Sequence, residues 1–209
     1  GEDVDIKIVE ADASAMQTKY AFKILGYEKL AEEKKVGLLN LSDDILVGKT
    51  VYIGKHEMSF QVPSILLKSD LFVNVPKLKI MRATKISCAM KNIFGCIGSP
   101  KKVVYHRFLH EAIVGINSIL RPHLTIVDGL VALGRFPVKL GLIMVGADTF
   151  SVDWIASHIM GYNQWTVKFL KVAVREKLGN PDAIITRGEN VADLKKIFPK
   201  GNFASSNYW

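Results

Sequence analysis

One stretch of the chain has the residue types of an anion-binding site. It runs from Leu71 to His110 and contains no aspartate or glutamate in forty residues. Such a run of like charges is repulsive unless solvent or a bound anion compensates it. Apolar residues, glycine and proline interrupt the run, so it is expected to fold rather than form a disordered basic tail. Its basic side chains are Lys77, Lys79, Arg82, Lys85, Lys91, Lys101, Lys102 and Arg107, with His106 and His110 beside them.

Donor side chains in this stretch suit a carboxylate or a phosphate. They are Lys77, Lys79, Lys91, Asn92 and His106. Downstream, Asp128 and Asp153 could orient a lysine, accept a proton or hold a cation.

We therefore predict an anion-binding cleft formed by residues 77–106 with Asp128 and Asp153. The alternative is that the lysines form a solvated surface and the aspartates cap helices. For Asp148, capping is the stronger interpretation, because this residue directly precedes a predicted helix start.

Other spacings in the same stretch favour neither a metal site nor a redox pair. His106 and His110 are four residues apart, as in some helical metal sites, but no carboxylate or cysteine is near in sequence, so surface or core histidines are expected. Cys88 and Cys96 fit neither a redox pair nor a zinc hook, and we interpret both as buried free thiols. Gly95 is followed by neither a dinucleotide-binding fingerprint nor the Walker lysine spacing.

The elements that must position these residues alternate between strand and helix patterns. Residues 5–10, 15–35 and 36–41 predict a strand, a helix broken near Gly26, and a parallel strand. Residues 50–62 predict a hairpin around Gly54 and Lys55, followed by a short helix after Pro63.

The basic stretch is expected to begin at the end of a strand. Residues 71–75 form an apolar strand that Pro76 should end, which would place Lys77 and Lys79 just past its carboxyl end, where open α/β sheets bind ligands. Residues 84–92 predict a helix with Ser87 and Lys91 on one face.

Further strands and helices are predicted after the basic stretch. Asp128 should follow a strand over residues 123–127, and Asp153 should lie on the helix after a strand over residues 140–145. The remaining patterns indicate helices at residues 108–120, 163–178 and 192–198 and a strand at residues 182–186, with a tail at 201–209 that could be mobile or a docking segment. The predicted fold is a single α/β domain over residues 1–209, with a mostly parallel, possibly mixed, sheet and helices on both faces in three layers.

Composition narrows the classes of protein. The 209 residues are 49% hydrophobic, enough for one sizeable core. Two cysteines do not suggest a disulfide-stapled secreted domain, so a reducing, cytoplasmic setting is expected, and no apolar run reaches the length of a membrane span. The net charge of +8 arises beyond residue 44, because residues 1–44 hold six lysines and ten acidic residues. It permits an anionic ligand, an acidic protein or nucleic acid.

Three segments together resemble the domain-of-unknown-function family 362. They are PKLKIMRATKISCAMKNIFGCIGSPKKVVYH, TIVDGLVAL and LGLIMVGADTFSVDWIASHIMG. Residues 5–45 also resemble the preceding strand-helix-strand part of that family. The residues that match the family's motifs are Pro76, Lys77, Lys79, Lys91, Asn92, Gly95, His106, Asp128, Gly129, Asp148, Asp153, Met160 and Gly161.

The resemblance implies a site but no activity. Two departures matter: Met81 stands where members often have a histidine, and the loop over Gly134–Pro137 is short. Members are often longer and joined to a ferredoxin-like module with [4Fe-4S] clusters, which would lie outside this chain. The expected ligand-binding residues are Lys77, Lys79, Lys91, Asn92, Gly95, His106 and Asp128, and the catalytic candidates are Lys91, His106, Asp128 and Asp153.

Three functions remain open. The chain could bind a small anionic metabolite, with or without catalysis, beside an iron-sulfur module. It could instead be a non-catalytic domain that docks an acidic, ferredoxin-like redox partner. Nucleic-acid binding is the weakest, since only Phe94 and Tyr105 lie among the basic residues and no recognised module is present.

Overall fold

The computed structural model describes residues 4–134 and 136–198. Its N-terminal unit consists of strand β1 (Lys7–Glu10), helices α1 (Thr18–Ile24) and α2 (Tyr27–Lys34), and strand β2 (Gly37–Asn40). The two strands pair in parallel, as predicted from the strand-helix-strand order. The predicted break near Gly26 is confirmed: this residue has a φ of 76°, and α2 begins directly after it.

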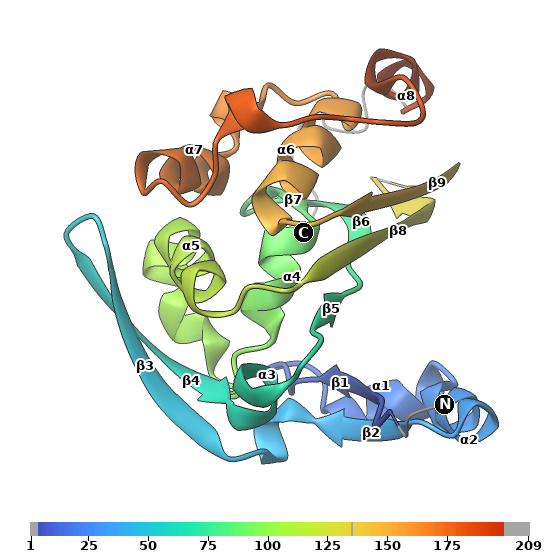
Figure 1. The fold of residues 1–209 in the computed structure, drawn as a ribbon, viewed down its shortest axis with the longest axis vertical. Helices are drawn as coiled ribbons and strands as arrows, with labels where there is room; N and C mark the ends of the chain where they lie inside the picture. The colour runs from blue at the N-terminus through green and yellow to red at the C-terminus, as the bar shows by residue number, and fades with distance from the viewer. Residues whose placement is uncertain (1–3, 135, 199–209) are drawn as a thin grey trace.

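The predicted hairpin is also confirmed and forms a separate two-stranded sheet. Strands β3 (Leu46–Ile53) and β4 (His56–Pro63) pair antiparallel, with Ile53 opposite His56 across the turn. The hairpin curves along one side of the molecule (Figure 1). The short helix α3 (Ser64–Lys68) follows it, and the backbone N–H of Ile65 donates to the Asp44 carboxylate at 2.8 Å.

The largest sheet is built around one long central strand. Strand β8 (Leu124–Leu133) pairs in parallel with β5 (Val73–Asn74) and β6 (Lys77–Met81), and antiparallel with β9 (Pro137–Gly146). Strand β7 (Lys85–Ser87) adds antiparallel to β6. Buried residues of this sheet, such as Leu78, Ile86 and Val127, contribute to the main hydrophobic core.

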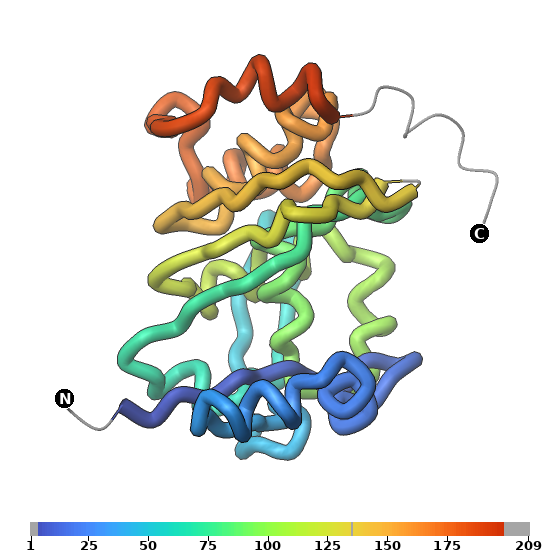
Figure 2. Tube along the Cα trace, turned by 90° about the vertical axis from the view of Figure 1, so that its right-hand side faces the viewer, coloured from blue at the N-terminus to red at the C-terminus, as the bar shows by residue number. Residues whose placement is uncertain are grey.

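The described residues after β7 contain five further helices. They are α4 (Ala89–Gly95), α5 (Leu109–Ile119), α6 (Thr149–Ile159), α7 (Lys168–Arg175) and α8 (Val191–Ile197). The 3-10 turns are η1 (Leu41–Asp43), η2 (Lys102–Phe108), η3 (Gln164–Thr166) and η4 (Pro181–Ala183). In Figures 1 and 2, α6, α7 and α8 lie at one end of the molecule and the N-terminal unit at the other, with the main sheet, α4 and α5 between them.

The α/β content of the predicted fold is confirmed, but its mostly parallel, three-layer sheet is not. The described residues form small, mixed sheets in which parallel and antiparallel pairs both occur. The connection lengths explain this mixture. Only residues 134–136 separate β8 from β9, and a parallel connection would require a crossover of roughly a dozen residues.

A strand ends before Pro76, as predicted, but a second strand begins directly after this proline. It lies in a short interruption between β5 and β6, where its missing N–H removes no ladder bond, and its carbonyl accepts a hydrogen bond from Asp128 N at 2.9 Å. Lys77 and Lys79 are therefore inside a strand rather than in a loop beyond one. Asp128 is also inside a strand, because β8 continues to Leu133.

Two other predicted elements differ from the structure. Residues 85–87 form strand β7, so Ser87 does not share a helical face with Lys91. Residues 182–186 form no strand, and the chain there makes the turn η4. The helix predicted at residues 192–198 is confirmed as α8, whereas the tail at 201–209 lies outside the described residues.

Helix length also bears on membrane association. In the parts of the chain that the structure describes, no helix is both long enough and apolar enough to cross a bilayer.

Candidate functional site

Three lysines from the basic stretch converge from different elements. Lys79 lies in β6, Lys91 in α4 and Lys102 in η2, and we call them the lysine cluster. The pKa of Lys91 is lowered from its ordinary value, first by burial and then by the positive charges of Lys79 and Lys102. The fold therefore brings together lysines that the sequence separates by 11 or more residues.

Among the described residues, the Lys91 ammonium has no acidic partner within ion-pair distance. Within residues 4–134 and 136–198, no carboxylate lies within 4.0 Å of Lys79 or Lys91. Lys91 Nζ is 5.6 Å from the centroid of the Phe94 ring, a contact that stabilises a cation only modestly. A partly buried, unpaired ammonium beside a second lysine is a favourable position for an anion.

Lys102 connects this cluster to the N-terminal unit. Its Nζ donates a hydrogen bond to the backbone carbonyl of Asp12 at 2.9 Å. Burial lowers its pKa, while the nearby acidic groups, Glu10 before Asp12, act in the opposite direction. Lys102 is thus the member of the cluster whose charge is partly compensated.

Lys77 and Asp128 form an ion pair across two parallel strands. The residues are Cα partners in β6 and β8, and Lys77 Nζ lies 2.8 Å from Asp128 Oδ2. The hydrogen bond from Lys77 is the main reason that the pKa of Asp128 is lowered, and Leu130 N donates to its other oxygen at 3.1 Å. Because Asp128 neutralises part of its charge, Lys77 is less available to an anionic ligand than Lys91 is.

Asp153, a residue of α6, lies in the interior with its side chain at the beginning of α4. Its side chain accepts hydrogen bonds from Ala89 N at 2.6 Å and Met90 N at 3.0 Å, and the residue is fully buried. Burial raises its pKa to about 7. Asp153 therefore holds the first residues of α4 in place. Lys91 lies on the same helix, two residues after Ala89.

The capping interpretation of Asp148 is confirmed. Its Oδ1 accepts a hydrogen bond from Ser151 N at 2.7 Å at the start of α6. Asp148 therefore caps α6, which directly follows it, whereas Asp153 caps α4, which lies far from it in the sequence.

The other expected site residues lie on α4 and η2. Asn92 donates to Oδ1 of buried Asn74 at 2.8 Å, and Gly95 is the last residue of α4. His106 is exposed in η2 and makes no hydrogen bond or ion pair with the described residues. His110 belongs to α5 instead, so the two histidines do not share a regular α-helix.

Side chains that could bind a metal do not cluster in the described residues, and the two cysteines form no disulfide. The described part of the chain has no group of three histidine, cysteine, aspartate or glutamate side chains able to hold a metal ion. Cys88 and Cys96 are free thiols, and burial raises the pKa of both.

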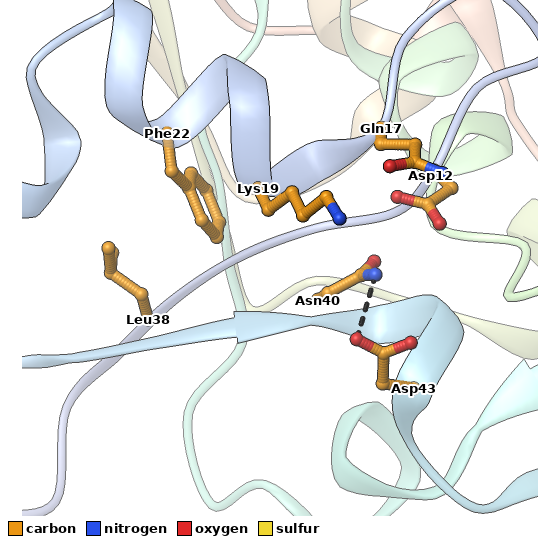
Figure 3. Close-up of a pocket in the computed structure, with 7 residues that line it drawn as sticks. All are labelled: Asp12, Gln17, Lys19, Phe22, Leu38, Asn40 and Asp43. Atoms are coloured by element: carbon orange, nitrogen blue, oxygen red, sulfur yellow. Dashed lines mark hydrogen bonds between the residues drawn. The ribbon is translucent and has the colours of Figure 1, made fainter.

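Sequence reasoning missed a polar pocket beside the N-terminal unit (Figure 3). It has a volume of about 330 Å³. Its lining residues are Asp12, Gln17, Lys19, Phe22, Leu38, Asn40 and Asp43. The predicted parallel pairing of residues 5–10 and 36–41 is the signal that could have found it, because ligands bind at the carboxyl ends of such strands, where Asp12 and Asn40 lie.

Comparison with known proteins gives one family and one distant relative. The sequence profile of the family described as Domain of unknown function (DUF362) matches residues 1–158. A protein of Synechocystis sp., named Thylakoid-associated protein sll1697, is 29% identical over 132 residues, which cover 56% of this chain and 40% of that protein. The chain thus matches less than half the length of this relative. No solved structure matches significantly.

Proposed function

Because this chain belongs to the DUF362 family, a domain of unknown function, we propose its function from the lysine cluster. The chain binds a small anion, a carboxylate or a phosphate, at Lys79, Lys91 and Lys102. The observation that carries this proposal is the environment of Lys91. Its ammonium is partly buried beside two other lysines and has no carboxylate within ion-pair distance in the described chain.

The energetic argument concerns desolvation. Burying an ammonium without a partner costs free energy, and placing like charges beside it adds to that cost. A bound anion would recover part of the cost by accepting charge-assisted hydrogen bonds from two or three ammonium groups. The ligand-free cluster is therefore the high-energy state, and anion binding relieves it.

Lys91 is also the cluster residue best suited to chemistry. A lowered pKa leaves a larger neutral fraction of the amine near neutral pH than an ordinary lysine has. A neutral amine can accept a proton from a bound ligand or act as a nucleophile, whereas an ammonium can only donate. If the proposed site is catalytic, Lys91 is its base or nucleophile.

A small anion fits the cluster better than nucleic acid does. The two aromatic residues between Lys77 and Arg107 are already engaged in the protein core: Phe94 is buried, and Tyr105 stacks on Phe60 with ring centroids 5.2 Å apart. Tyr105 also donates its hydroxyl proton to the Ser59 carbonyl at 2.7 Å. Neither ring is free to stack on a base.

The proposal extends to the iron-sulfur association that the family resemblance implies. The chain has two cysteines, fewer than the four thiolates of a typical [4Fe-4S] site, so a cluster would belong to a module outside this sequence. The anion site would then act beside that module.

The test compares Lys91→Ala with Lys171→Ala. Lys171 is an exposed lysine on α7, so its replacement removes the same charge from another part of the molecule. Thermal stabilisation by phosphate, pyrophosphate, citrate and succinate is measured at low and moderate salt. We expect at least one anion to stabilise the wild-type protein and the Lys171→Ala variant, and Lys91→Ala to bind it about tenfold more weakly.

Two results would overturn the proposal. One is equal anion affinity in a folded Lys91→Ala variant. The other is stabilisation by no anion at either salt concentration, which would favour docking of an acidic protein partner on the basic surface.

A further inference from the structure

The polar pocket of the N-terminal unit is lined by none of the three lysines of the lysine cluster, although Lys102 donates to the backbone carbonyl of Asp12 at its edge. From its lining, we propose that it binds a neutral ligand with adjacent hydroxyl groups, such as a ribose or hexose ring. The proposal does not depend on anion binding at Lys91. It rests on where the pocket lies, which hydrogen-bonding groups it presents, and which charges line it.

The pocket opens at the carboxyl ends of two parallel strands. Glu10 and Asn40 are paired at the ends of β1 and β2, and Asp12 and Asp43 follow within three residues of these strand ends. Ligands of open α/β sheets bind at this edge, and an acidic residue after the second strand is the group that accepts ribose hydroxyls in dinucleotide-binding folds. This chain has the acidic residue but not the glycine-rich phosphate loop, so the sugar-binding half of that arrangement is the relevant one.

The acidic groups are held in place by the protein. Asp12 Oδ1 accepts a hydrogen bond from Thr18 N at 2.7 Å, and Asp43 Oδ2 accepts one from Asn40 Nδ2 at 3.0 Å. Asn40 is itself fixed, because its Oδ1 accepts from Ser42 N at 3.1 Å. Asp43 Oδ1 has no hydrogen-bond partner within the described residues, so it remains available as an acceptor.

The lining carries both signs of charge, two carboxylates and one ammonium, and this mixture favours a ligand with hydroxyl groups. Two carboxylates and the Lys19 ammonium line the same pocket, and Figure 3 shows the Lys19 Nζ between the acidic end and the rest of the cavity. A ligand cation would meet Lys19, and a ligand anion would meet Asp12 and Asp43, each at a cost in like-charge repulsion. Hydroxyl groups avoid both costs, because they donate to carboxylates and accept from the ammonium.

The opposite end of the pocket is apolar. Phe22 and Leu38 lie across from the carboxylates in Figure 3. A sugar ring presents hydroxyl groups around its rim and C–H groups on its face, so it can contact both ends at once. The volume of about 330 Å³ is within the usual range of small-molecule sites.

Binding is tested by saturation-transfer NMR and titration calorimetry with D-ribose, D-glucose, adenosine and, as matched probes that lack one hydroxyl, 2-deoxy-D-ribose and 2′-deoxyadenosine. The variant is Asp43→Ala, and the control is Asp182→Ala, which removes an exposed carboxylate from η4. We expect at least one hydroxylated probe to bind, its deoxy counterpart to bind more weakly, and Asp43→Ala to lose about tenfold in affinity. Asp182→Ala should bind like the wild-type protein.

The Lys19→Ala variant tests the sign of the ligand's charge. A neutral ligand should lose only a few-fold in affinity when Lys19 is removed. Binding of none of the five probes, equal affinity in wild type and Asp43→Ala, or selective binding of polyamines that strengthens in Lys19→Ala would each overturn the proposal. These outcomes are independent of the Lys91 experiment, because neither the probes nor the variants involve the lysine cluster.

Discussion

Asp153 caps a helix that begins 64 residues earlier in the chain, with its Oδ1 2.6 Å from the backbone nitrogen of Ala89. The same carboxylate accepts from Met90 N, so one buried side chain from α6 satisfies two of the free N–H groups at the start of α4. Since α4 carries Lys91, this contact links the core to the proposed anion site.

The stability of the protein should depend on the protonation of Asp153. Burial raises its folded-state pKa to about 7 from an ordinary value of 3.8, so the folded state keeps a proton that the unfolded chain releases between these values. The stabilisation is complete below about pH 4 and is lost as the pH rises to about 7. Asp153→Asn cannot titrate and therefore serves as the reference. The difference in the free energy of unfolding, wild type minus variant, should fall by up to a few kcal/mol as the pH rises over this range.

Urea denaturation at several pH values measures this difference. The variant also carries a constant penalty, because an asparagine side chain accepts from only one of the two backbone N–H groups without opposing the other. A difference that is independent of pH, or that grows as the pH rises, would show that Asp153 is ionised throughout.

Removal of the Lys91 charge should stabilise the ligand-free protein. Its ammonium is desolvated and lies beside Lys79 and Lys102, so Lys91→Met should raise the free energy of unfolding by roughly 1 kcal/mol. Lys91→Arg keeps the charge and serves as the control. Denaturation is measured in an anion-poor buffer. A loss of more than about 1 kcal/mol in Lys91→Met would mean that the charge stabilises the fold rather than a bound ligand.

Gly129 should be intolerant of any side chain. A Cβ at this position would lie 2.9 Å from the carbonyl oxygen of Leu142 on β9, a backbone atom that cannot rotate away. Gly129→Ala should therefore cost about 1–3 kcal/mol of stability. Gly48→Ala is the matched control, because a Cβ there meets nothing within 4 Å and its effect should be close to zero. Equal urea midpoints for the two variants would contradict this explanation.

The sequence alone determined the features that depend on neighbouring residues. The strand-helix-strand order of the N-terminal unit, the break at Gly26, the hairpin around Gly54 and Lys55 and the Asp148 cap follow from periodicity, glycine positions and local hydrogen bonds. The acid-free run from Leu71 to His110 is likewise a property of composition. It predicts that a ligand of this stretch would be anionic.

Tertiary structure decided which of these residues meet. Pro76 predicts a strand end, yet the chain resumes pairing at Lys77 because β8 is long enough to accompany both β5 and β6. The role of Asp153 depends on packing α6 against α4, and the approach of Lys79, Lys91 and Lys102 depends on three elements docking together. These are long-range contacts, and no local pattern encodes the partner of a buried carboxylate or the charge around a lysine.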